Sequence, residues 1–412
     1  MWELIRVNKR NSVLLLAAMA SCLIALGLII GMAWAGRNGG MFGILIALGI
    51  WLVLTLISFS AGDQILLTAS GATPVTHEVN PRLFNVVEEM SIAAGLPVPK
   101  VYIINDPSPN AFATGRTPQT ASIAVTAGLL GKLNRDELQG VVAHEMSHIL
   151  HRDILFVTLA GILLGAVALL SQVFLRGLFY GGMGSRRRYS SGGKNAGAAL
   201  AVMMLIAIIF AILAPIMTQL LYFALSRRRE YMADAGAARL TRYPEGLASA
   251  LEKIAADTSP QLAAANNVTA PMYIANPLKK TGQWTLSDLT STHPPISERI
   301  RILRNMTQGA SFKDYSDAFE NVTKKKSVVP ASALTKENIA LRQASEEAKS
   351  ERITKQMREV GDIMRKVNGF LFLTCACGVV LKIPPNYKQG SVKCPRCHRT
   401  HQIQASSSTV NP

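Results

Sequence analysis

Four long runs of apolar residues limit what this chain can fold into. Each run holds roughly the 20 residues that an α-helix needs to cross a hydrocarbon core about 30 Å thick. They cover residues 13–34, 41–59, 155–174 and 198–225. Apolar residues make up 49% of the 412-residue chain and charged residues only 17%, which is typical of a membrane protein with soluble parts. We therefore predict a multi-span α-helical membrane protein.

Basic residues ahead of the first run give the predicted spans a direction. These are Arg6, Lys9 and Arg10, and such charges favour a cytoplasmic N-terminus. Two spans then return the chain to the cytoplasm, so that residues 61–154 and everything after residue 226 lie on that side. The first run could instead be a cleaved signal peptide, but it is longer than a typical signal core and a second span follows at once. The basic loop at residues 177–197 lies outside in this topology, so residues 155–225 are either a transmembrane or an interfacial hairpin.

One stretch between the second and third runs has the spacing of a metal site. Residues 137–150 are predicted to lie in a helix, with Asn134 capping its start and Glu137 completing a capping box. His144 and His148 are four residues apart and share one face of that helix, so both imidazoles can bind one metal ion. Glu145 is placed to act on a nearby water as a general base. This spacing is typical of zinc peptidases; the alternative is a surface helix that carries two histidines by chance.

A catalytic zinc site needs a third protein ligand and one position left open for water. Candidates follow the fourth apolar run, where Glu230 and Asp234 are one helical turn apart. Glu230 can bind the metal, while Asp234 can accept the other N–H of a ligand histidine, for which His144 is the candidate. From spacing alone, a run of arginines followed by solvated acidic residues explains this stretch equally well.

The segment between the second run and the zinc helix is predicted to hold a small sheet. Residues 80–95 have the pattern of an amphipathic helix, and three short stretches have the pattern of strands. These stretches are residues 100–104, 110–115 and 121–125. An edge strand beside a metal site can bind an extended peptide through backbone hydrogen bonds. An ordinary packed hairpin is the equally plain alternative.

Four motifs, taken in order, resemble the HtpX-like membrane metallopeptidases, relatives of the CAAX prenyl proteases. The motifs are Asn110-Ala-Phe-Ala-Thr-Gly115, His144-Glu-Met-Ser-His148, Ser226-Arg-Arg-Arg-Glu230-Tyr-Met-Ala-Asp234 and Thr292-His-Pro-Pro295. The resemblance covers about residues 1–305. It implies an α+β, zincin-type peptidase domain built from two segments around the hairpin, residues 61–154 and 226–305, after two transmembrane helices in residues 1–60.

The resemblance also implies what the site residues do. Zinc would be bound by His144, His148 and Glu230, with Glu145 as the base. Asn110 and His293 would lie near the scissile carbonyl, and Arg299 would support the site. The family cleaves membrane or misfolded proteins at the cytoplasmic face of the bacterial inner membrane. A CAAX-type processing protease with one defined substrate is the alternative enzyme, and a membrane scaffold with a structural metal site is the non-enzymatic alternative.

Three polar neighbours of these motifs are assigned structural places. His151 could approach the metal but is predicted to be a polar residue at the end of the zinc helix. Asp153 is predicted to be an interfacial charge ahead of the third run. Glu298 is predicted to be a solvated helix residue.

Beyond residue 305 the family resemblance ends. Residues 306–332 are polar and are predicted to be a linker, and residues 334–367 are predicted to form one helix of mixed charge. Together with the next few residues they make up a connecting region, 306–370. A coiled-coil arm is the alternative for the helix, although its apolar seam is thin.

Four of the five cysteines lie in residues 371–404 as two close pairs. They are Cys375 with Cys377 and Cys394 with Cys397. Such pairs resemble a zinc ribbon, in which two turns give four thiolates to a closed structural site, and a segment this short needs a metal to fold. Disulfides are the alternative, but they need an oxidising compartment, which disagrees with a cytoplasmic C-terminus. We therefore predict a second zinc ion.

The net charge of +17 bears on partners. It does not indicate nucleic acid, because basic and aromatic residues are not interleaved as base-stacking surfaces require. Anionic lipid headgroups beside the membrane explain the charge more simply. The predicted partners are thus a polypeptide substrate, itself a membrane protein, and an anionic lipid surface.

Overall fold

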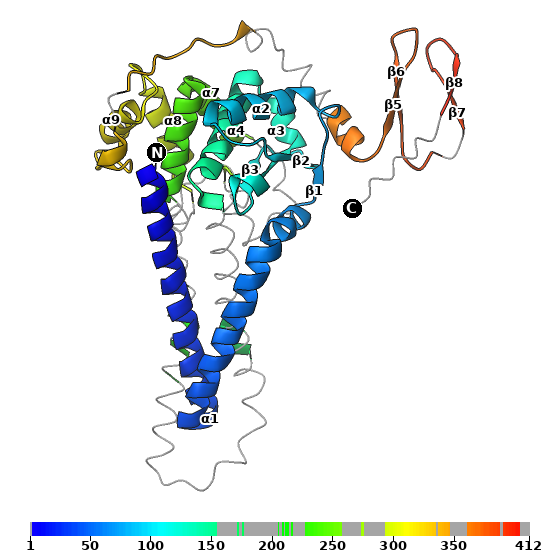
Figure 1. The fold of residues 1–412 in the computed structure, drawn as a ribbon. Coiled ribbons are helices and arrows are strands. Elements are labelled where there is room, and N and C mark those ends of the chain that lie inside the picture. Colours follow the sequence, from blue (N-terminus) through cyan, green and yellow to red (C-terminus); the bar gives the residue numbers. More distant parts are fainter. Residues whose placement is uncertain are drawn as a thin grey trace.

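The structure of the protein is a computed structural model (Figure 1). It describes residues 2–154, 227–257, 273–275, 293–334, 337–346, 361–387 and 390–403, together with scattered positions between 171 and 216. The third and fourth predicted spans lie almost entirely outside the described residues.

The first two apolar runs form α1 (Trp2–Ala69), whose two arms converge at one end (Figure 1). Small residues allow the arms to touch: a Cβ atom at Gly27 would lie 2.5 Å from the carbonyl oxygen of Gly43. Within α1, Asn38–Ala69 is long and apolar enough to cross a membrane, and Leu16–Met32 is a shorter apolar segment. Among the described residues the structure therefore holds one candidate span where we predicted two, and the multi-span prediction is not confirmed.

A four-stranded mixed sheet follows α1. Its strands are β1 (Ala72–Pro74), β2 (Lys100–Ile104), β3 (Ala111–Thr114) and β4 (Ser122–Thr126). The order is β1-β2-β4-β3, with β2 and β4 parallel and the other pairs antiparallel. The three predicted strands are confirmed. β3 is an edge strand in this order, and all of its residues are buried.

Capping residues set the ends of the helices around the sheet. The side chain of Asn80 accepts a hydrogen bond from the Leu83 amide at the start of α2 (Pro81–Ala94), and Gly95 ends that helix at φ 64°. After the short α3 (Ala127–Lys132), Asn134 and Glu137 form the predicted capping box of α4 (Arg135–Leu150). The predicted helices at 80–95 and 137–150 are both confirmed.

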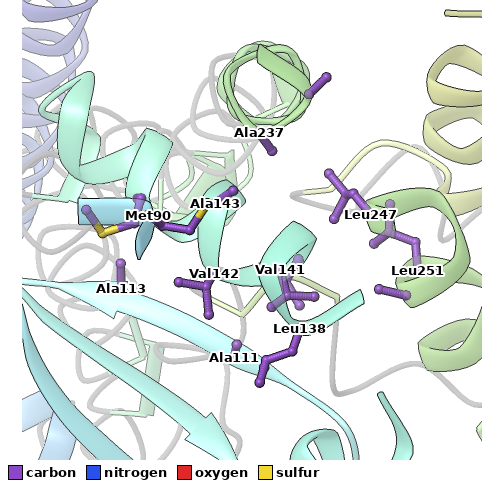
Figure 2. Close-up of a cluster of buried hydrophobic side chains, with 14 of the residues drawn as sticks. Met90, Ala111, Ala113, Leu138, Val141, Val142, Ala143, Ala237, Leu247 and Leu251 are labelled. Atoms are coloured by element: carbon purple, nitrogen blue, oxygen red, sulfur yellow. The ribbon is translucent and has the colours of Figure 1, made fainter. Parts of the chain in front are cut away.

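The core of the soluble domain surrounds α4. Val141, Val142 and Leu138 on this helix lie among side chains from β3, α2 and α7 (Pro244–Ala255) (Figure 2). A Cβ atom at Gly140 would lie 2.6 Å from the backbone nitrogen of Leu247, so α4 and α7 approach too closely for any side chain there. Thirteen of the 16 residues of α4 are buried, so its polar side chains need partners within the protein.

Residues after 305 differ from the predicted linker. After α8 (Ile296–Arg304), α9 (Phe312–Thr323) packs on the domain through buried Phe312, Tyr315 and Phe319. The prediction of a plain linker is therefore wrong, because this amphipathic helix belongs to the core. Two short 3₁₀ turns, Pro118–Thr120 and Ala331–Ala333, complete the domain.

The predicted charged helix over residues 334–367 is also wrong in its first part. Residues 337–345 are not helical and run along the domain surface. The amide of Arg342 donates to the carbonyl of Arg242, and the amide of Ala310 donates to Ile339. The guanidinium of Arg342 binds Asp136. These tertiary contacts override the helical propensity of the segment.

The C-terminal module consists of two small hairpins joined to the domain by a helix over residues 361–367 (Figure 1). Its strands are β5 (Leu371–Thr374), β6 (Val380–Ile383), β7 (Ser391–Lys393) and β8 (Thr400–Gln402), paired antiparallel as β5–β6 and β7–β8. Ile363, Met364 and Val367 pack against the domain core, which ties the module to the domain.

Candidate metal centre

The two histidines of α4 form the base of the site. Nε2 of His144 lies 3.2 Å from Nε2 of His148, as expected for residues one turn apart on one helix face. His144 is fully buried and the His148 side chain is 13% exposed. Both rings therefore point their Nε2 atoms into the same enclosed space.

A second helix, over residues 227–241, brings Glu230 to these rings. One Glu230 oxygen lies 3.6 Å from Nε2 of His144 and the other lies 3.5 Å from Nε2 of His148. A tetrahedral zinc ion with bonds of 2.0–2.2 Å requires its ligand atoms to be about 3.3–3.6 Å apart. The three separations observed here match that requirement, so the donor set fits a zinc ion.

Asp234 lies one turn beyond Glu230 and fixes the orientation of His144. Its Oδ1 atom is 3.0 Å from Nδ1 of His144, and both side chains are fully buried. The guanidinium of Arg299 donates to both oxygens of Asp234, at 2.7 and 2.8 Å. Although burial opposes it, the charge of Arg299 keeps the pKa of Asp234 below its usual range, so this carboxylate stays ionised. The structure thus places Arg299 behind the metal site, in contact with its supporting acid.

Asp153 fixes the orientation of His148 as Asp234 fixes that of His144, through a contact with Nδ1 of the ring. Its carboxylate lies 3.3 Å from Nδ1 of His148 and is 1% exposed. The prediction that Asp153 is an interfacial charge is therefore wrong. Burial opposes protonation of His148, but the carboxylates of Asp153 and Glu230 raise its pKa to about 10. The sequence could have indicated this pair, because α4 ends at Leu150 and Asp153 follows His148 by only five residues.

Glu145 points into the same space without joining the ligands. It is 1% exposed, and its Oε1 atom has no hydrogen-bond partner among the described residues. Burial raises the pKa of this carboxyl, while the nearby imidazoles and the amide of Ala113 lower it, with a net upward shift. A buried carboxylate oxygen without a protein partner is suited to binding water or substrate.

The two remaining predicted residues, His293 and Asn110, have different surroundings. His293 lies at the centre, with Nδ1 3.1 Å from a Glu230 oxygen, and is 4% exposed. Asn110 is buried, but its amide nitrogen donates to the carbonyl of Ala275 at 2.9 Å. Its amide is thus bound to the protein's own backbone.

Two further residues near the site, His151 and Glu298, have defined positions in the structure. His151 is the C-cap of α4, as predicted for the end of that helix, and burial lowers its pKa to about 4. Glu298 accepts a hydrogen bond from the hydroxyl of Tyr231 and is partly buried, so the prediction of a solvated residue is wrong.

The four cysteines of the C-terminal module also converge. Their Sγ atoms lie within 4.8 Å of one another, with Cys375 and Cys397 3.3 Å apart and Cys377 and Cys394 3.5 Å apart. Each pair sits in a tight turn that ends in a left-handed residue, Gly378 at φ 81° or His398 at φ 59°. The two turns thus end alike, although the first is one residue shorter, and both present their thiols to one point as the knuckles of a metal site do.

Comparison with known proteins places this geometry in a family. The sequence model of peptidase family M48 matches residues 77–307. A protease HtpX homologue from Dictyoglomus turgidum is 50% identical over 267 residues, which cover 65% of this chain and 83% of that protein. A protease HtpX homologue from Caldanaerobacter subterraneus subsp. tengcongensis is 46% identical over 308 residues, which cover 74% of this chain and 98% of that protein.

A solved structure, that of S. mikatae Ste24p, is similar at a TM-score of 0.40 and 21% identity, covering 74% of this chain and 67% of that chain. The family match spans more than half of the chain and includes both histidines of α4, Glu230 and Asp234. The chain therefore belongs to peptidase family M48, as an HtpX-like membrane metallopeptidase that uses zinc and acts on polypeptides.

Proposed function

We propose that this protein is a zinc endopeptidase that hydrolyses membrane or misfolded proteins at the cytoplasmic face of the bacterial inner membrane. The observation that carries the proposal is the set of three donor atoms from His144, His148 and Glu230, 3.2–3.6 Å apart, beside the buried carboxylate of Glu145. A closed structural site would need a fourth protein ligand. The described residues offer three in this cluster, which leaves a position for water or substrate.

The residues of the chain divide the chemistry between them. Zinc, when bound by the two histidines and Glu230, supplies Lewis-acid activation of the attacking water and of the peptide carbonyl. Glu145 accepts the proton of that water and then donates it to the leaving amine. Because burial raises the pKa of this carboxyl, it is better able to carry a proton than an exposed glutamate. Asp234 and Asp153 hold the two imidazoles in the tautomer that frees Nε2.

His293 is the group that we assign to stabilise the developing oxyanion. It is buried beside Glu230, and a ring N–H at this position can donate to charge that develops on the carbonyl oxygen. Asn110 takes part in this step only when its amide leaves the carbonyl of Ala275. We therefore assign Asn110 chiefly to backbone binding along β3.

We further propose that the C-terminal module holds a second, structural zinc ion through Cys375, Cys377, Cys394 and Cys397. The convergence of the four thiols and the left-handed residue that ends each turn support this. The module packs on the domain through residues 361–367, so it can regulate the peptidase or recruit substrates to it.

Our proposed topology has two transmembrane helices in residues 1–60 and a transmembrane or interfacial hairpin over 155–225. This arrangement puts the two parts of the metal site, residues 61–154 and 226–305, on the cytoplasmic side with the C-terminal module. The net charge of +17 supports an anionic lipid surface as a partner.

The test is cleavage of fluorescein-labelled casein, an unfolded protein, and of a membrane-protein substrate by the detergent-purified full chain. Wild type is compared with Glu145→Ala, and zinc is counted in both. Two zinc ions in each protein with cleavage by wild type alone supports the proposal. Zinc binding without cleavage by wild type favours the scaffold alternative, and cleavage of one membrane protein but not of casein favours a processing protease. Equal cleavage by both proteins shows that Glu145 is not the base.

A further inference from the structure

A three-residue segment of the chain lies along the free edge of β3. It consists of Tyr273, Ile274 and Ala275, all buried, at 1%, 1% and 6% exposure. The amide of Ile274 donates to the carbonyl of Ala111 at 2.9 Å. The rings of Tyr273 and Phe112 meet edge to face, with centroids 5.1 Å apart. The segment therefore lies against β3 and is joined to it by a backbone hydrogen bond.

The segment runs antiparallel to β3. Tyr273 lies opposite Phe112, Ile274 opposite Ala111, and Ala275 opposite Asn110. On its other side β3 pairs with β4, where the amide of Thr126 donates to the carbonyl of Asn110. Because successive residues of a strand point their backbone groups to opposite sides, Ala111 and Ala113 face the free edge.

This free edge leads to the catalytic base. The amide of Ala113 faces the carboxylate of Glu145. The carbonyl of Ala111, in contrast, accepts the hydrogen bond from the amide of Ile274. A peptide paired antiparallel with β3 would therefore present its scissile bond near Ala113. The residues after that bond would then lie opposite Phe112, Ala111 and Asn110, where Tyr273, Ile274 and Ala275 now lie.

The groups that hold the segment recognise backbone rather than side chains. Arg299 donates to the carbonyl of Ile274 at 2.9 Å. Asn110 donates to the carbonyl of Ala275 at 2.9 Å and accepts from the amide of that residue at 3.4 Å. Any extended peptide offers the same carbonyls and amides. The side chain of Ile274 is the one apolar contribution, and it lies in the core cluster.

We propose that Tyr273–Ile274–Ala275 is an internal substrate analogue that occupies the substrate-binding edge of β3 in the resting enzyme. Tyr273 and Ile274 fill the positions of the first two residues that follow the scissile bond, and the substrate must displace the whole segment. The buried site of Ile274 then selects an aliphatic residue at the second position after the cleaved bond. This inference rests on the proposed peptidase function, because it assigns a register to substrate on that site.

The first test compares Ile274→Pro with Ile274→Val on casein cleavage, with zinc counted in each. Proline removes the amide that binds Ala111, whereas valine keeps that amide and an apolar side chain. One backbone hydrogen bond changes an equilibrium by about three- to tenfold, and the apparent affinity for substrate follows the fraction of the open form. We expect Ile274→Pro to lower KM about three- to tenfold with kcat and zinc content unchanged, and Ile274→Val to behave as wild type.

The second test uses a synthetic peptide with the sequence of residues 271–276, Pro-Met-Tyr-Ile-Ala-Asn, capped at both ends, and a scrambled control. We expect competitive inhibition by the native order alone, stronger against Ile274→Pro than against wild type. A version with lysine in place of isoleucine should inhibit at least tenfold less well, since a lysine cannot be buried without a partner.

A third measurement does not depend on turnover. Hydrogen exchange around Ile274 should be slow in the resting protein and should speed up when a peptide hydroxamate binds. If Ile274→Pro holds its zinc but loses cleavage, the segment builds the site and the inference is overturned. If the proline variant does not fold, non-competitive or absent inhibition by the peptide overturns it instead. A wild type that cleaves no better than Glu145→Ala refutes the peptidase function itself, an outcome distinct from both.

Discussion

Replacement of Asp234 by asparagine tests how the metal centre is supported. The carboxylate binds Nδ1 of His144 at 3.0 Å with both groups fully buried. A hydrogen bond to a charged partner contributes about 1.5–3 kcal/mol and a neutral one about 1 kcal/mol. Asparagine keeps the shape but loses the charge, so the bond should weaken by about 1–2 kcal/mol, which is five- to thirtyfold in affinity. The supporting partners of metal ligands in general contribute about 10- to 100-fold.

The assay is a zinc titration against a competing chromogenic chelator. It uses the detergent-purified chain with Cys394→Ser and Cys397→Ser, which leaves a single metal site. Asp317→Asn is the matched control. That carboxylate is 57% exposed and forms an ion pair with Lys313, far from the metal site in the sequence. We expect Asp234→Asn to weaken zinc binding five- to thirtyfold and the control to leave it unchanged. Affinity within twofold of the parent for Asp234→Asn, or an equal loss in the control, would refute the reasoning.

Three further predictions concern packing and the C-terminal region. Gly140→Ala should destabilise the protein by about 1–3 kcal/mol, seen as a lower melting temperature, because its Cβ would lie 2.6 Å from the backbone of Leu247; an unchanged melting point would contradict the close packing. Arg342→Ala removes the ion pair with Asp136 and should release residues 337–346, so that a glutamate-specific endopeptidase cleaves after Glu337 or Glu346 faster at unchanged zinc content. Cys397→Ser should lower the zinc count from two to one while casein cleavage by the catalytic site persists; retention of both ions would remove the proposed ribbon site.

Local patterns were sufficient to predict the centre of the fold. The capping box at Asn134 and Glu137 and the strand at residues 100–104 occur where the sequence places them, because caps and strand alternation are decided by neighbouring residues. The approach of His144 and His148 follows from helix geometry alone. The approach of Glu230 to these histidines does not follow from helix geometry. Only the order of the motifs and the family resemblance indicated that approach.

What the sequence did not reveal depends on tertiary contacts. Residues 337–345 have helical composition, yet Arg342 and its neighbours bind the domain surface as an extended segment. Asp153 resembles an interfacial charge until the end of α4 turns it back toward His148. Ile274 lies in a stretch without a periodic pattern, so its pairing with Ala111 could be found only in three dimensions.

Arg299 connects the two halves of the site physically. It is fully buried, and a buried guanidinium must have its donors satisfied. Two of its nitrogens bind Asp234, which orients His144, and a third donates to the carbonyl of Ile274 on the edge of β3. When substrate replaces the segment, a substrate carbonyl must take over this third bond, or the charge loses a partner in the protein interior. Arg299 therefore favours any occupant that pairs with β3 over an empty edge, which is consistent with peptides that share only an aliphatic residue at the Ile274 position binding there and with the chain placing a segment of its own there when no peptide is present.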